Sequence, residues 1–253
     1  MKSIKIFIAS TLCILPIVYI LMISLSTNYT YPSLLPAGIT FKKYSTLFAT
    51  TEGMGTSFLT SILIASIVAL LATVIGFLSS RAIANSKYHK QWLFCCYFPI
   101  ALSPVVFAAT FHFYFIYVDI AGTLVGVILA QLFIAIPYSI LLLSSFWSNQ
   151  IMAIEQTSYT LGANFKNTFF KVLLPIAKPT LLICFFQVFL LSWFDYGVTS
   201  FIGVGKVPTL TIKVFQYINE ANIYYAALGS CVIVLPVIIL LWVNKRFVFS
   251  KIN

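Results

Sequence analysis

Six long apolar segments alternate with shorter polar stretches along this chain. They cover residues 6–26, 56–79, 92–118, 122–146, 180–203 and 225–244. Each is close to or longer than the ~20 residues that an α-helix needs to cross ~30 Å of hydrocarbon. A helix also satisfies its own backbone N–H and C=O groups, as a bilayer requires. The pattern predicts an all-α membrane protein with six transmembrane helices, forming a single transmembrane domain over residues 1–253.

The composition indicates that the bilayer is the solvent. The chain is 61% apolar and 8% charged, whereas charged residues make up about a quarter of a soluble domain. A net charge of +10 is typical of nucleic-acid-binding proteins, but here the basic residues are scattered between apolar segments and form no patch. We therefore expect membrane lipid, and no nucleic acid, as a partner. The five cysteines include no CxxC pair, so no metal site is expected.

The distribution of basic residues predicts the orientation of the spans. Because six spans return the chain to its starting side, both termini share one side of the membrane. Eleven basic residues lie on that side: Lys2, Lys5, Arg81, Lys87, Lys90, Lys166, Lys171, Lys178, Lys245, Arg246 and Lys251. Four lie on the other: Lys42, Lys43, Lys206 and Lys213. Cytoplasmic loops carry an excess of Lys and Arg, so both termini are predicted to be cytoplasmic.

The predicted cytoplasmic loop 147–179 carries apolar residues at helical spacing. These residues are Ile154, Leu161, Phe165 and Val172. Ser148 or Asn149 is suited to begin a helix. Gly162 marks a break, and Pro175 closes the segment. The pattern predicts a helix, a sharp turn at Gly162 and a second short helix, lying across the cytoplasmic face rather than through the membrane.

The same loop carries a family resemblance in Glu155, Gln156, Thr157, Ser158, Leu161, Gly162, Ala163, Val172, Leu174 and Pro175. It resembles the EAA loop of ABC importer permeases, whose pattern is Glu-Ala-Ala, three residues, Gly, nine residues, Ile, one residue and Leu-Pro. From Gly162 onward the spacing agrees with that pattern. The front departs from it, because Gln156 stands at the place of the Glu. Thr157 and Ser158 replace the two Ala, and Glu155 supplies an acid one position earlier.

The resemblance implies a type I ABC importer permease in the cytoplasmic (inner) membrane of a bacterium. In that family the short helix before the glycine docks into a groove on a separate ATP-binding subunit. The permease is then not an enzyme and binds no cofactor, since ATP and Mg²⁺ belong to the partner ATPase. The other implied partners are an extracytoplasmic solute-binding protein and a second permease, homologous but not identical. The segment Phe194-Asp195-Tyr196-Gly197 resembles permeases of the branch that serves polyamines, ferric iron, thiamine, phosphonates and sulfate.

An alternative interpretation of loop 147–179 is an amphipathic segment that rests on lipid headgroups. Lys166, Lys171 and Lys178 would hold it there. Interfacial binding places no demand on the spacing from Gly162 to Pro175, so the spacing favours the coupling role.

Asp195 is the acid that the apolar pattern places inside a span. An ionisable residue at that depth costs ~2.5–3.5 kcal/mol on insertion scales, so it needs a partner, a water-filled cavity or a proton. Two interpretations stay open: Asp195 lines the translocation pathway, or it packs between helices through hydrogen bonds. His112 and Gln187 are weaker pathway candidates, because a polar residue in a span is more often satisfied by an interhelical hydrogen bond.

Two other functional classes compete with the permease. An ion-driven secondary transporter would use Asp195 as its coupling carboxylate, but it leaves the spacing from Gly162 to Pro175 unexplained. A membrane enzyme or a purely structural subunit has less support. The two histidines and five acids are spread over different segments, so we expect neither a catalytic group nor a metal cluster.

Overall fold

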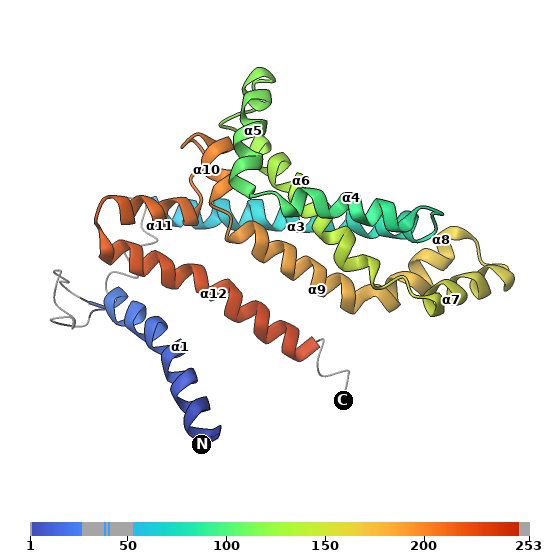
Figure 1. The fold of residues 1–253 in the computed structure, drawn as a ribbon, viewed down its shortest axis with the longest axis horizontal. Coiled ribbons are helices and arrows are strands. Elements are labelled where there is room, and N and C mark those ends of the chain that lie inside the picture. The colour runs from blue at the N-terminus through green and yellow to red at the C-terminus, as the bar shows by residue number, and fades with distance from the viewer. Residues whose placement is uncertain (1, 27–37, 39, 41–52, 248–253) are drawn as a thin grey trace. The chain divides into compact units, whose positions relative to one another are not determined.

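The computed structural model describes residues 2–26, 38, 40 and 53–247, and its regular elements are helices (Figure 1). They are α1 (Lys2–Ser24), α3 (Met54–Ala84), α4 (His89–Ala101), α5 (Pro104–Tyr117), α6 (Leu124–Ser144), α7 (Asn149–Thr160), α8 (Phe165–Thr168), the π-helix η1 (Phe169–Leu173), α9 (Leu174–Trp193), α10 (Gly197–Gly203), α11 (Leu210–Asn219) and α12 (Ile223–Phe247). Neither these elements nor the described residues between them form a strand, which confirms the predicted all-α class.

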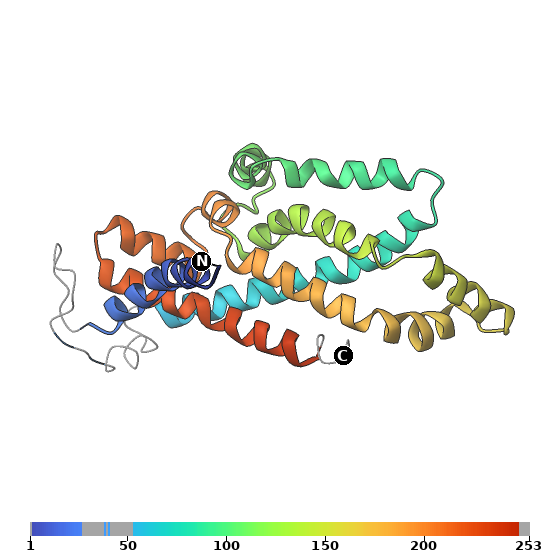
Figure 2. The ribbon, with the colours of Figure 1, turned by 60° about the horizontal axis from the view of Figure 1, so that its bottom comes forward.

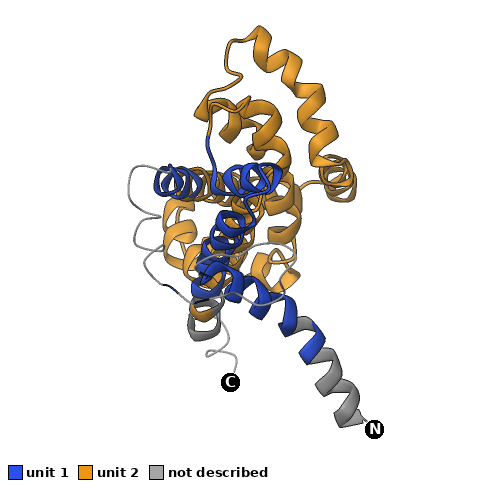
Figure 3. Ribbon diagram, turned by 90° about the vertical axis from the view of Figure 1, so that its left-hand side faces the viewer, with its two compact units in different colours: residues 1–61, 208–239 blue, residues 62–207, 240–253 orange. Residues whose placement is uncertain are grey.

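The chain divides into two compact units, each built from segments distant in sequence (Figure 3). One unit comprises residues 1–61 and 208–239, and the other comprises residues 62–207 and 240–253. The second unit contains the predicted cytoplasmic loop and the pathway candidates. Because both units are discontinuous in sequence, they are not separate sequence domains, and the single transmembrane domain stays a prediction.

Four helical segments of the described chain are long and apolar enough to cross a membrane: Met54–Ala84, Leu124–Ser144, Phe165–Trp193 and Ile223–Leu240. The pair α4 and α5 would supply a fifth span if it counts as one. In α1 the apolar stretch Ile14–Ser24 is shorter. Most of each predicted span therefore falls on helical backbone, whereas the number six and the orientation of the termini stay predictions.

The third predicted span, residues 92–118, is divided between two helices. Its two halves, α4 and α5, meet at an angle of 90° across a short break. Leu102 and Ser103 are extended there, and Pro104 begins α5. A proline disfavours helical backbone at the preceding residue but fits the first turn of a new helix, so the chain bends at this point. Pro99, by contrast, lies inside α4.

The fifth predicted span, residues 180–203, is shifted along the chain. The helical run extends from Phe165 through η1 and α9 to Trp193, and α10 follows as a separate helix. Pro175 therefore does not close a short cytoplasmic helix, as the sequence suggested, because it lies in the first turn of α9. The π-helical turn directly before it changes the backbone hydrogen-bonding register, which is where a residue without an N–H is tolerated.

Small residues let the helices α3 and α6 approach closely inside the second unit. A Cβ on Gly76 would lie 2.1 Å from Oγ of Ser139, so only glycine fits that position. The Ser139 hydroxyl donates to the backbone oxygen of Ala72 at 2.6 Å. Close approach of backbones at small residues, with hydroxyl hydrogen bonds across the contact, is how helices associate in a bilayer.

The connection 204–224 contains the amphipathic helix α11, which belongs to the first unit. The Thr209 hydroxyl caps it by accepting from the backbone N–H of Ile212, and Leu210, Val214 and Tyr217 bury one face. The backbone N–H of Leu210 donates to Oγ of Ser61 at 2.8 Å, which fixes α11 against the start of α3. The spacing of three and four residues between the buried positions follows the helical period.

Candidate coupling segment and translocation site

The helix and the turn that were predicted within residues 147–179 are confirmed. Helix α7 begins after an extended Ser148, whose side chain makes no capping bond, and the chain reverses at Gly162. Gly162 has a φ of +84°, and its N–H donates to the oxygen of Tyr159 at 3.0 Å. Left-handed backbone of this kind favours glycine, which explains why the helix ends here. Asn164 then caps α8 by accepting from the N–H of Asn167 at 2.9 Å.

Helices α7 and α8 form the two arms of a hairpin, which we call the coupling segment and define as residues 149–168. In Figure 2 the olive α7 runs out to a sharp turn, from which the chain returns through α8 into α9. The hydroxyls of Ser158 and Thr168 lie 2.9 Å apart and join the arms, and Thr168 is fully buried. The second arm is therefore continuous with the candidate span Phe165–Trp193 and is not a separate surface helix.

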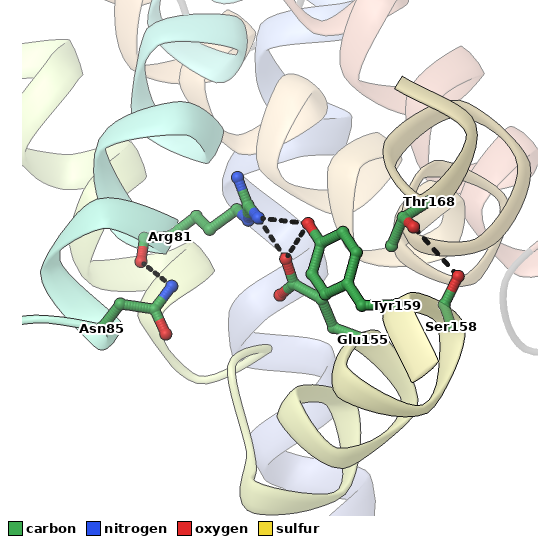
Figure 4. A network of polar contacts seen from close by, with 6 residues as sticks. All are labelled: Arg81, Asn85, Glu155, Ser158, Tyr159 and Thr168. Atoms are coloured by element: carbon green, nitrogen blue, oxygen red, sulfur yellow. Dashed lines mark hydrogen bonds and ion pairs between the residues drawn. The ribbon is translucent and has the colours of Figure 1, made fainter. Parts of the chain in front are cut away.

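The side chain of Glu155 points toward the end of α3. Its carboxylate pairs with the guanidinium of Arg81 in the last turn of α3 (Figure 4). The Tyr159 hydroxyl donates to Oε1 of Glu155 at 3.2 Å and accepts from Arg81 at 3.4 Å. The guanidinium carbon of Arg81 also lies 4.8 Å from the ring centroid of Phe165, within cation–π range. We call Arg81, Glu155 and Tyr159 the clasp.

An aromatic cluster holds the same end of α3 to both sides of the coupling segment. The ring of Phe77 lies 5.2 Å from Trp147, 6.0 Å from Phe146 and 5.9 Å from Phe169, measured between centroids. Trp147 donates from Nε1 to Oγ of Ser80 at 2.9 Å, and both residues are buried. Phe77, Ser80 and Arg81 are three and four residues apart, so they share one face of α3.

Much of the coupling segment is exposed. Three of the four residues of the predicted apolar face are exposed: Ile154 at 42%, Leu161 at 83% and Phe165 at 55%. The adjoining Gln156 and Thr157 are exposed as well. We call Ile154, Gln156, Thr157 and Leu161 the tip, and its exposed apolar side chains favour contact with a partner surface. Lys166 and Lys171 are also exposed, as contact with lipid headgroups would require. The lipid-headgroup alternative therefore stays open.

Leu174 and Pro175 lie apart from the tip, although the family pattern groups them with it. They line a groove of about 610 Å³ between α9 and α3, together with Leu70, Val74 and Lys178. Ala163, just beyond the turn, is half-buried and donates from its N–H to the oxygen of Ser158 at 3.1 Å. The predicted coupling residues therefore divide into an exposed tip, an inward clasp and the start of a span.

Asp195 lies in the break between α9 and α10 and not within a helix. Its carboxylate accepts from the backbone N–H groups of Val198 and Thr199 at 3.2 and 2.9 Å, and from the Thr199 hydroxyl at 2.6 Å. It thereby caps α10. Nε2 of the buried Gln131 in α6 adds a bond at 3.1 Å, and Gln131 accepts in turn from Ser192. These contacts support the packing interpretation of Asp195.

Gln187 belongs to a different site. It is exposed on α9 and accepts from the Tyr138 hydroxyl of α6 at 2.7 Å. Both line a cavity of about 380 Å³ with Tyr97 and Ile100 of α4. His112, on α5, is half-buried, and its Nδ1 has no hydrogen-bond partner among the described residues. The three predicted pathway residues therefore do not converge on one site.

Sequence reasoning missed Arg81, Gln131 and Tyr138 as site residues. Arg81 was interpreted as an orientation signal, and the other two are unremarkable polar residues in apolar spans. An arginine in the last turn of a span, facing a loop with a lone acid, is the signal that identifies the clasp. In the described part of the chain, His, Cys, Asp and Glu form no group suited to hold a metal ion.

Comparisons with known proteins agree with this architecture. Residues 72–250 match the family model described as "Binding-protein-dependent transport system inner membrane component". The trehalose transport system permease protein SugB of Mycobacterium tuberculosis is 25% identical over 249 residues, which cover 95% of this chain and 90% of that protein. A chain of a bacterial ABC transporter involved in the import of alginate shares the fold, with a TM-score of 0.72, 17% identity and coverage of 97% and 94%.

A second relative matches over a shorter stretch. The ferric transport system permease protein FbpB of Actinobacillus pleuropneumoniae is 28% identical over 128 residues. The match covers 48% of this chain and 18% of that protein, so the chain spans about a fifth of the length of this relative.

Proposed function

We propose, on the premise that the chain belongs to the family of binding-protein-dependent transport system inner membrane components, that it is the permease subunit of an ATP-driven importer. The observation that carries this proposal is the coupling segment. Its exposed apolar tip, with Leu161 83% exposed, is held rigidly against the last turn of α3 by the clasp and the aromatic cluster. A rigid element with an uncovered apolar surface is suited to receive a movement from another subunit.

The partner that fits the tip is an ATP-binding subunit. This chain would dock into it with Ile154, Gln156, Thr157 and Leu161, while Gly162 sets the angle between the two arms. ATP and Mg²⁺ would bind on the partner, and the permease would act as a translocation component and not as an enzyme. Closure of the ATPases would then displace α7 and reorient the spans between inward-facing and outward-facing states.

The pathway would be shared with a second, homologous permease and fed by a solute-binding protein. We place the cavity of Tyr97, Tyr138 and Gln187 on its wall, because an exposed amide within a span is unfavourable against lipid. The named relatives serve trehalose and ferric iron, which suggests a small polar solute captured by the binding protein. An ion-driven carrier lacks a comparable basis, since Asp195 is engaged as a helix cap.

Affinity purification from the native membrane in mild detergent, followed by mass spectrometry, tests the proposal. We expect an ATP-binding subunit, a second permease and a solute-binding protein to remain attached. A Leu161→Asp variant should lose the ATPase while still inserting. Ile218→Asp, the same kind of change at an exposed apolar position of α11, serves as the control that keeps it. Recovery of the wild-type chain without any ATPase would refute the proposal.

A further inference from the structure

We propose that Arg81, Glu155 and Tyr159 are positioning residues that make α7 and the end of α3 move as one body. A displacement of α7 by an ATPase would then enter α3 directly, and not only through the chain connections to α6 and α9. This inference rests on the proposed function, because it assumes that an ATPase moves α7. It assigns Glu155 to contact with its own chain and leaves contact with the partner to the exposed tip.

The burial of Glu155 supports this assignment. The residue is 6% exposed, whereas its neighbours Gln156 and Thr157 are exposed. A buried carboxylate is tolerated when an opposite charge and further hydrogen bonds satisfy it. Arg81 and Tyr159 supply both. A partner subunit that approaches the tip would therefore meet Gln156 and Leu161 first, and Glu155 would already be engaged.

The backbone at the two ends of α7 explains why the helix needs such a contact. Ser148 is extended at its start, and Gly162 is left-handed at its end, with no atom within 4 Å of where its Cβ would lie. Both are places where the backbone direction changes with little steric restraint. A helix attached only through two such points could change its angle when pushed. The clasp fixes that angle from the side.

Arg81 is suited to this role because it contacts both arms of the coupling segment. It reaches α7 through Glu155 and Tyr159, and α8 through the ring of Phe165. Phe77 and Ser80, on the same face of α3, bind the residues that lead into α7 and the π-helical turn that follows α8. The last two turns of α3 thus contact both arms of the coupling segment and the residues on either side of it. Because α3 continues unbroken to Met54, a displacement of its end is carried along the helix.

A double-mutant cycle in the complete importer distinguishes positioning from direct ATPase contact. The variants are Arg81→Gln, Glu155→Gln and the two combined. Lys87→Gln is the matched control, because it removes an exposed positive charge from the same cytoplasmic connection. The measurements are the amount of ATPase retained on purification, and the solute transported per ATP hydrolysed in proteoliposomes.

We expect each single variant to retain the ATPase and to lower the transport-to-ATP ratio about fivefold to tenfold, in the range of typical coupling energies. The double variant should be no worse than either single one, because neither charge is then left buried alone. Lys87→Gln should match the wild type. Arg81→Lys, which keeps the charge, should recover part of the ratio.

Several results would overturn the inference. Loss of the ATPase in Glu155→Gln but not in Arg81→Gln would show that Glu155 contacts the ATPase directly. A wild-type ratio in both single variants, or independent effects that multiply in the double variant, would show that the clasp carries no movement. If a single variant fails to insert, the transport-to-ATP ratio of the double variant is compared with that of the wild type instead. A wild-type ratio in the double variant would then overturn the inference. A wild-type chain that binds no ATPase would refute the proposed function itself, and the inference with it.

Discussion

The two acids Glu155 and Asp195 illustrate two different uses of a shielded carboxylate in one protein. Glu155 pairs with a cation on another helix, Arg81 of α3. Asp195 is bound mostly to groups three and four residues further along its own chain, at the start of α10. The first contact joins two elements that can otherwise move separately, whereas the second stabilises a local turn. Substituting Glu155 should therefore destabilise the protein more, and affect the contact between two elements, whereas substituting Asp195 should affect only the local turn.

The largest effect should come from Glu155→Ala. Removing one partner of a buried ion pair costs about 3 kcal/mol, because it leaves a charge without compensation. The loss should appear as faster amide hydrogen exchange throughout α7 (Asn149–Thr160), with little change in α10. Unchanged exchange in α7 would show that the aromatic cluster alone holds the coupling segment.

Gly162→Val should have the next largest effect. A β-branched residue with a φ near +84° costs roughly 1–2 kcal/mol even where no atom obstructs its side chain. We expect the angle between α7 and α8 to change and ATPase retention to fall, as measured by co-purification. Gly162→Asn is the matched control, because asparagine tolerates left-handed backbone better. Equal retention in both variants would remove the conformational explanation.

Asp195→Asn should have a smaller and more local effect. An amide keeps one acceptor but loses the charge that favours the positive end of α10, so we expect about 1 kcal/mol of destabilisation. Hydrogen exchange should rise in α10 (Gly197–Gly203), while transport per folded protein stays at the wild-type level. Altered transport in a fully stable variant would instead place Asp195 on the pathway.

The smallest effect should come from salt. Arg81 and Glu155 retain 19% and 8% side-chain exposure, so raising the ionic strength should weaken their pair only slightly, by about 0.5 kcal/mol. The exchange of α7 should increase accordingly. The cap of α10, which depends mainly on local hydrogen bonds from Val198 and Thr199, should respond less. A larger increase of hydrogen exchange in α10 than in α7 would show that the Asp195 cap depends more on charge than the pair of Arg81 and Glu155.

The apolar pattern predicted the helical class and the approximate place of each span, because crossing a bilayer demands long apolar helices whatever their neighbours are. It failed where the backbone changes direction inside an apolar stretch. The break before Pro104 and the end of α9 at Trp193 are both surrounded by apolar residues, so hydropathy gives no warning of them. Gly162 was predictable, since a helical pattern ending in glycine has a local cause.

The sequence by itself therefore determined that this protein is helical, membrane-embedded and provided with a hairpin that turns at Gly162. Only the tertiary structure decided which way the hairpin's charges face. Arg81 and Glu155 are 74 residues apart, and their pairing depends on the packing of α3 against the coupling segment. Periodicity and turn propensity act over a few residues, whereas the pairing of charges on distant helices is fixed only when the helices pack.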